Sequence, residues 1–101
     1  MCQIFRTQDP QRYRAETRAI RLHGQMTSVR LERAFWGILK EIADSEGMTV
    51  SQFASTLYDE VMEQTGEMAN FASFLRVTCL TYLSNNRGVH PELSRKIQQA
   101  A

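Results

Sequence analysis

The sequence predicts a mainly α-helical fold, in which a short N-terminal strand pairs antiparallel across a dimer and is followed by three helices. Residues 18–31 alternate between apolar and polar side chains with a period of two, the pattern of a half-buried strand. From residue 32 to about residue 84, apolar residues instead recur with the period of a helix. The last helical segment is apolar on nearly every side. Two short helices cannot cover it, so we expect a second copy of the chain to share its core.

Length and composition limit the chain to one domain and to few classes of protein. The 101 residues leave no room for a second independent core. No apolar run approaches the roughly 20 residues of a membrane-spanning helix, and the N-terminus lacks the apolar segment of a secretory signal. Two cysteines in such a chain are typical of reduced thiols in the cytosol. We therefore expect a cytoplasmic protein with no membrane contact.

The first segment, residues 1–17, is predicted to be an irregular basic arm because it shows no steady period and contains Asp9-Pro10. Six arginines precede Glu32 against two acidic residues, whereas residues 32–66 carry seven acidic residues and two basic ones. This asymmetry favours contact between the N-terminal third and an anionic partner. A solvated arm without a ligand is the alternative.

The unpaired backbone N–H and C=O groups along the edge of the alternating segment can find hydrogen-bond partners in two ways. If Gly24-Gln25 is a turn, residues 19–23 and 27–31 pair within one chain; otherwise the 26–31 strands of two chains pair across a two-fold axis. The second arrangement forms the dimer predicted above, and whether residues 19–23 form a second strand stays open. In both, Val29 and Leu31 share the buried face of the strand.

Two amphipathic helices follow the strand. The first spans residues 32–45 and ends near Gly47, because glycine suits the left-handed position after a helix. The second spans residues 50–64 and begins at a capping box formed by Thr49 and Gln52.

A third helix is expected from about Asn70, a suitable N-cap, to Leu83. It completes a domain that we place at residues 18–84. Residues 85–101 are expected to form a turn and a short helical tail that begins at Pro91.

The strand and the first two helices carry motifs with a distinctive spacing, namely Thr27-Ser28-Val29-Arg30-Leu31-Glu32, Ala34-Phe35-Trp36, Gly47-Met48-Thr49 and Phe53. With these motifs the chain resembles a ribbon-helix-helix domain of the Arc and methionine-repressor type. It resembles more narrowly a bacterial subgroup with a third helical segment, over roughly residues 17–83. The resemblance implies a dimeric transcription regulator that inserts a two-stranded ribbon into the major groove of double-stranded DNA.

The resemblance also implies which residues read the DNA bases. Met26, Ser28 and Arg30 take the base-reading positions, and Met26 departs from the family by offering an apolar side chain there. Free N–H groups at the start of the second helix, together with the two arginines before the ribbon, suit phosphates. The phosphate candidates are Thr49, Val50, Ser51, Arg18 and Arg21. The expected dimer core consists of Val29, Leu31, Phe35, Trp36, Phe53 and Leu57.

The sequence gives little support to an enzyme. His23 and His90 do not lie at metal-ligand spacing with the two cysteines, and Cys79 lies in the apolar third helix, where a small core residue is the simpler interpretation. The carboxylates of residues 59–63 lack a histidine companion and are expected to form a solvated acidic face. We expect no metal, no cofactor and no catalytic residue.

One alternative function belongs to a different class. A protein of this fold can serve as an interaction module or an antitoxin-like partner binder that uses the third helix and the C-terminal tail. The net charge of +1 favours this alternative slightly, because strong DNA binders are usually more basic.

Overall fold

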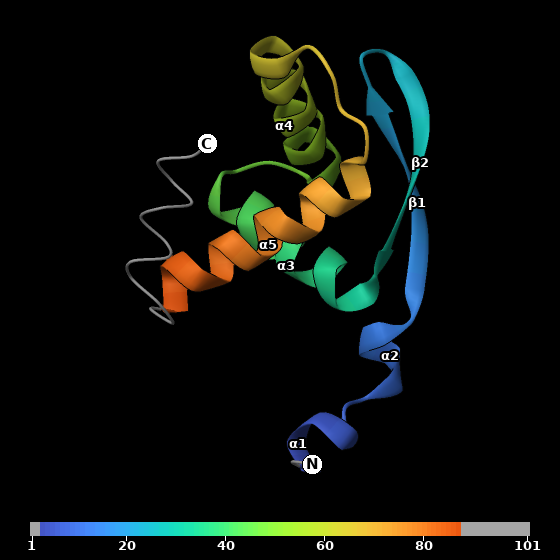
Figure 1. Ribbon diagram of the computed structural model, residues 1–101, viewed down its shortest axis with the longest axis vertical. Helices are drawn as coiled ribbons and strands as arrows, with labels where there is room; N and C mark the ends of the chain where they lie inside the picture. The colour runs from blue at the N-terminus through green and yellow to red at the C-terminus, as the bar shows by residue number, and fades with distance from the viewer. Residues whose placement is uncertain (1–2, 88–101) are drawn as a thin grey trace.

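In the part of the chain that the structure describes, three long helices pack on one face of a β-hairpin. The computed structural model describes residues 3–87. In chain order the elements are α1 (Gln3–Arg6), α2 (Pro10–Tyr13), β1 (Ala15–Leu22), β2 (Gln25–Glu32), α3 (Arg33–Ser45), α4 (Val50–Thr65) and α5 (Phe71–Arg87). Helices α3, α4 and α5 lie to one side of the hairpin, and no described element covers its other side (Figure 1).

Both strands of the hairpin belong to the same chain. Strands β1 and β2 pair antiparallel in the register Leu22 opposite Gln25 through Ala15 opposite Glu32. The loop between them is His23-Gly24, with φ angles of 50° and 78°. Positive φ at both loop residues is the backbone of a type I′ turn, whose twist matches that of the strands. The segment 19–23, left open by the sequence, is thus part of a second strand, except that His23 lies in the turn. Pairing across a dimer stays a prediction.

Alternation along the strands separates a buried face from an exposed one, as predicted. Ile20 and Leu22 from β1, with Val29 and Leu31 from β2, are each no more than 5% exposed. They pack against the helices and form one side of the core. The register therefore turns every intervening side chain toward the uncovered face of the hairpin.

The helices begin where the sequence predicts. In α4 the Thr49 side chain accepts a hydrogen bond from the Gln52 backbone N–H at 3.1 Å, and the Gln52 side chain accepts one from the Thr49 N–H at 2.9 Å. At the start of α5, Asn70 Oδ1 accepts from the Ser73 N–H at 3.1 Å. Helix α5 continues to Arg87, so the turn predicted at its end does not occur at residues 85–87. The short helix predicted from Pro91 lies outside the described residues.

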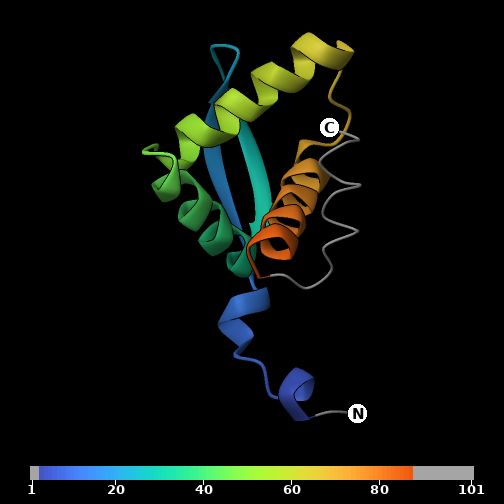
Figure 2. The ribbon, with the colours of Figure 1, turned by 90° about the vertical axis from the view of Figure 1, so that its left-hand side faces the viewer.

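Helix α5 packs against both β2 and α3 and completes a core formed by one chain (Figure 2). Leu75 and Cys79 of α5 are fully buried in the same cluster as Trp36 and Leu39 of α3. The residues expected to form a dimer core lie in this single-chain core or against it, namely Val29, Leu31, Phe35, Trp36, Phe53 and Leu57. The opposite face of α5 leaves Val77 and Leu80 more than half exposed.

The N-terminal segment is more regular than predicted. Asp9 caps α2 by accepting a hydrogen bond from the Gln11 N–H at 3.0 Å, and Pro10 occupies the first helical position. The Asp-Pro pair, interpreted from the sequence as a break, is therefore the start of a helical turn. Strand β1 then begins at Ala15, three residues before the predicted strand. None of the helices that the structure describes is both long and apolar enough to cross a membrane.

Replacement of Gly24 by alanine should destabilise the protein by about 1–2 kcal/mol, because a Cβ disfavours the positive φ of the turn. The matched control is Gly37→Ala in α3, where an added Cβ meets no atom within 4 Å. That change should raise stability by up to about 1 kcal/mol, since alanine favours a helix interior. Urea unfolding followed by circular dichroism measures both, and an unchanged midpoint for Gly24→Ala would contradict the assigned turn.

Candidate nucleic-acid interface

The uncovered face of the hairpin is a narrow surface built from both strands. Its central part consists of three cross-strand pairs, all of them exposed. They are Thr17 with Arg30, Ala19 with Ser28, and Arg21 with Met26. The structure thus brings the predicted base-reading residues of β2 together on one face and adds three residues of β1. We call these six residues the outer face of the hairpin.

The two arginines of the outer face are not paired with a carboxylate among the described residues. The Nη1 atom of Arg21 donates to the Gly24 carbonyl at 3.1 Å, which uses one of its five N–H groups. No hydrogen bond or ion pair joins Arg30 to another described residue. Both guanidinium groups therefore keep N–H donors for a ligand.

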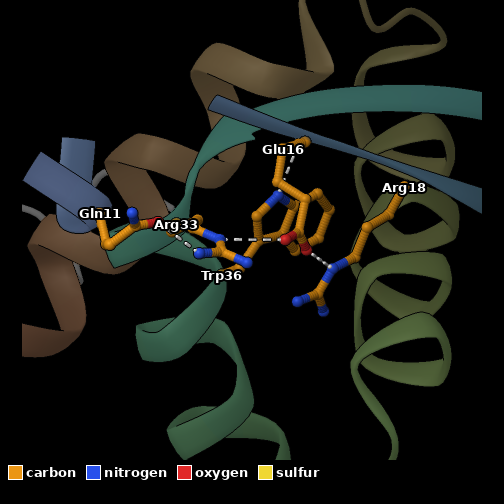
Figure 3. A network of polar contacts seen from close by, with 5 residues as sticks. All are labelled: Gln11, Glu16, Arg18, Arg33 and Trp36. Atoms are coloured by element: carbon orange, nitrogen blue, oxygen red, sulfur yellow. Dashed lines mark hydrogen bonds and ion pairs between the residues drawn. The ribbon is translucent and has the colours of Figure 1, made fainter. Parts of the chain in front are cut away.

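Arg18, predicted to contact phosphate, is held on the helix side of the hairpin (Figure 3). Its Nε donates to Glu16 Oε2 at 2.6 Å, and its guanidinium lies 4.7 Å from the centre of the Trp36 ring. A guanidinium over an indole face adds a cation–π attraction to the ion pair. Arg18 is thus separated from Arg21, with which the sequence analysis grouped it.

Glu16 is the centre of a network that joins β1 to α3 (Figure 3). Its carboxylate also accepts from Arg33 Nε at 3.2 Å, and Arg33 Nη1 donates to Gln11 Oε1 at 2.8 Å. Its backbone carbonyl accepts from Trp36 Nε1 at 2.8 Å. The hydrogen bonds from Arg18 and Arg33 lower the pKa of Glu16 below its usual value of 4.5. The start of β1 is therefore fixed against the first turn of α3.

A second glutamate holds an arginine of α5 at the end of β2. Arg76 Nε lies 3.0 Å from Glu32 Oε1, and Arg76 Nη2 lies 3.5 Å from Oε2. This hydrogen bonding from Arg76 lowers the pKa of Glu32 below 4.5. The positive charges of Arg76 and of the nearby Arg30 lower the pKa of Glu32 in the same direction.

The start of α4 lies beside Arg21, along the edge of β1. Arg21, His23 and Gly24 face Ser51, Gln52, Ser55, Thr56 and Asp59 across a groove of about 420 Å³. Of the predicted phosphate contacts, this brings Arg21 close to Ser51, whereas the Thr49 hydroxyl is engaged in the capping box. Asp59 also lines this groove, and its Oδ1 lies 3.3 Å from His23 Nδ1.

Cys79, expected from the sequence to be a small core residue, is fully buried in α5. Burial raises the pKa of the Cys79 thiol to about 12, so the reactive thiolate is scarce at neutral pH. No group of three or more metal-ligating side chains occurs within residues 3–87.

Thr17 and Ala19 were missed by the sequence analysis, and Arg21 was assigned to phosphate rather than to the face that carries Met26. The missing signal was the register of β1 and β2. Residues 15–17 hold no apolar alternation of their own, so nothing local marks them as strand.

The described geometry has counterparts among known proteins. A family model for a ribbon-helix-helix domain matches residues 15–83. Among solved structures, the chain is similar to an uncharacterized protein from Bordetella pertussis Tohama I, with 48% sequence identity and a TM-score of 0.82. The similarity covers 89% of this chain and 73% of that chain. No curated protein matches the sequence.

The Glu32–Arg76 pair should make stability depend on acidic pH. Its lowered pKa means that Glu32 contributes stability above pH 4.5 and loses it as pH falls through the folded-state pKa. Glu32→Gln should therefore be less stable than the wild type at neutral pH, and the difference should shrink in acid. Arg76→Gln should remove the same pH dependence. Urea unfolding of the wild type and the variants from acidic to neutral pH measures this dependence. A stability difference that grows as pH falls would contradict a stabilising Glu32–Arg76 pair.

Proposed function

Because the chain belongs to the ribbon-helix-helix family, whose members are generally DNA-binding transcription regulators, we propose that it is a bacterial transcription regulator. It binds double-stranded DNA by placing the outer face of the hairpin in the major groove. Two strands lie about 4.8 Å apart, and the major groove is about 12 Å wide, so a two-stranded ribbon fits.

One observation carries this proposal: the outer face presents two arginines, Arg21 and Arg30, that form no ion pair with a described carboxylate. Arg30 suits a bidentate pair of hydrogen bonds to guanine O6 and N7. Ser28 can donate or accept and so discriminates less, and Met26 offers an apolar contact to a thymine methyl group. Phosphates suit the first turn of α4 around Ser51, where free N–H groups and the helix dipole favour an anion.

We propose that the protein acts as a homodimer, the state in which ribbon-helix-helix proteins typically bind DNA. Val77 and Leu80, one turn apart on α5, supply exposed apolar surface for this association. The same surface is what favours the alternative function, an interaction module that holds a different protein.

Fluorescence anisotropy with labelled duplexes at about 50 and 200 mM salt separates the two functions. Binding that weakens steeply with salt and prefers some duplexes over others supports a DNA-binding regulator. A well-folded protein that binds no duplex at low salt would overturn the proposal and favour the interaction module.

Arg30→Ala should weaken binding to a preferred duplex about 5- to 150-fold and relax the sequence preference, since one guanine contact is lost. The control is Lys40→Ala, which removes the same charge from α3, where Lys40 pairs with Asp44 at 2.9 Å. Lys40→Ala should bind as the wild type does. Equal losses in the two variants would mean that Arg30 acts only through net charge.

A further inference from the structure

We propose that protonated His23, in the turn of the β-hairpin, forms a charge-assisted contact with Asp59 of α4, and that this contact makes the position of the turn depend on pH. We call it the tip contact. It holds the turn against α4 in mild acid and weakens as the pH rises through neutrality. Its effect on DNA affinity rests on the proposed function, whereas the contact itself does not.

The backbone of the turn gives the first reason to look for such a contact. Among the residues that the structure describes, His23 is the only one other than glycine with a positive φ, at 50°. A Cβ disfavours this conformation, although histidine adopts it more often than most residues do. Contacts of the His23 side chain are therefore needed to offset the cost of placing it there.

The side chain of His23 contacts two adjacent residues of α4. Its ring meets the ring of Tyr58 edge-on, with 5.1 Å between the ring centres, and its Nδ1 lies 3.3 Å from Asp59 Oδ1. Tyr58 in turn meets the ring of Phe71, at the start of α5, with 5.4 Å between the centres. The turn is thus connected to α4 directly and to α5 through Tyr58.

The oxygen of Asp59 that lies next to His23 lacks a hydrogen bond. Oδ1 is shielded from solvent and accepts no hydrogen bond from a described residue. A shielded acceptor without a donor is costly to the folded state. Neutral imidazole carries one N–H, on either Nδ1 or Nε2, whereas the imidazolium ion carries both. Protonation of His23 therefore always places a donor and a positive charge beside Oδ1.

The surroundings of His23 let this protonation respond to the solvent. About half of each side chain is exposed, 54% for His23 and 49% for Asp59. Histidine is the side chain that ordinarily changes charge between about pH 5 and 8. The charged residues that line the groove with His23 are Asp59 of α4 and Arg21 of β1, and no described charged residue of β2 or α5 lines it. Asp59 is the carboxylate in contact with the ring, so it favours the imidazolium ion.

The tip contact sets the separation between the two sides of the groove in which a phosphate is proposed to bind. Arg21 and Gly24 line the hairpin side of this groove, and Ser51 lines the α4 side. A phosphate that accepts hydrogen bonds from both sides needs them at a fixed separation, because charge-assisted hydrogen bonds are about 2.7–2.9 Å long. When the tip contact is lost, the turn is free to move away from α4. The affinity for DNA should then fall as the pH rises.

A double-mutant cycle tests the tip contact without DNA. Full-length wild type, His23→Gln, Asp59→Asn and the double variant are unfolded with urea at about pH 6 and about pH 8. In mild acid the coupling between the two residues should change the unfolding equilibrium constant by about 1.5- to 5-fold, the range of partly exposed ion pairs. It should be smaller at the higher pH. A coupling that is absent in mild acid, or equally large at both pH values, would overturn the inference.

Fluorescence anisotropy with a labelled duplex at the same two pH values tests the effect on DNA binding. Wild-type affinity should fall with rising pH more than that of Asp59→Asn, by up to the coupling factor of the cycle. The matched control is Glu60→Gln, which removes a carboxylate from α4 outside the groove and should keep the wild-type pH dependence.

The Asp59→Asn variant separates the tip contact from a simple effect of charge. Its His23 still gains a positive charge in mild acid but has no carboxylate to contact. Equal pH dependence in wild type and Asp59→Asn would mean that His23 acts on DNA through its charge alone, and the inference would be wrong. A wild-type protein that binds no duplex at either pH would instead overturn the proposed function, and the unfolding cycle would still decide whether the tip contact exists.

Discussion

The register of the β1–β2 hairpin is the constraint on which the rest of the structure depends. It is fixed at one end by the turn His23-Gly24, where both φ angles are positive, and at the other by the hydrogen bond from Trp36 to the Glu16 carbonyl. If β1 slipped by one residue relative to β2, its two faces would be exchanged. Ile20 would then face solvent and Arg21 would face the core. The same register that buries the apolar side chains therefore exposes the arginines.

Electrostatics of the hairpin follow from where its two glutamates lie. Glu16 faces the helices and forms ion pairs with Arg18 and Arg33 beside Trp36. Glu32 forms an ion pair with Arg76 of α5. Each pair is partly exposed, so its contribution to stability is modest and screened by salt. The larger effect is on charge distribution. Of the three arginines of the hairpin, only Arg18 has an ion pair, so Arg21 and Arg30 stand on the outer face without one among the described residues.

The sequence is sufficient for features that depend on local chemistry and insufficient for those that depend on distant partners. Alternation predicts the two faces of β2, and capping residues such as Thr49 predict the helix starts, because each signal lies within a few residues. The choice between pairing within a chain and between chains has no local signal, since both use the same alternation. Arg18 illustrates the limit for side chains: its place over Trp36 depends on a residue 18 positions away.

That β1 and β2 form a hairpin within one chain has a kinetic consequence. Only two residues separate β1 from β2, so the conformational entropy lost on closing the loop is small. Hairpins of this kind form in about 1–10 μs, far faster than assembly steps that require two chains to collide. The rate at which this hairpin forms is therefore independent of the concentration of the protein. A newly synthesised molecule therefore forms its outer face even at low protein concentration, because this step requires no second chain.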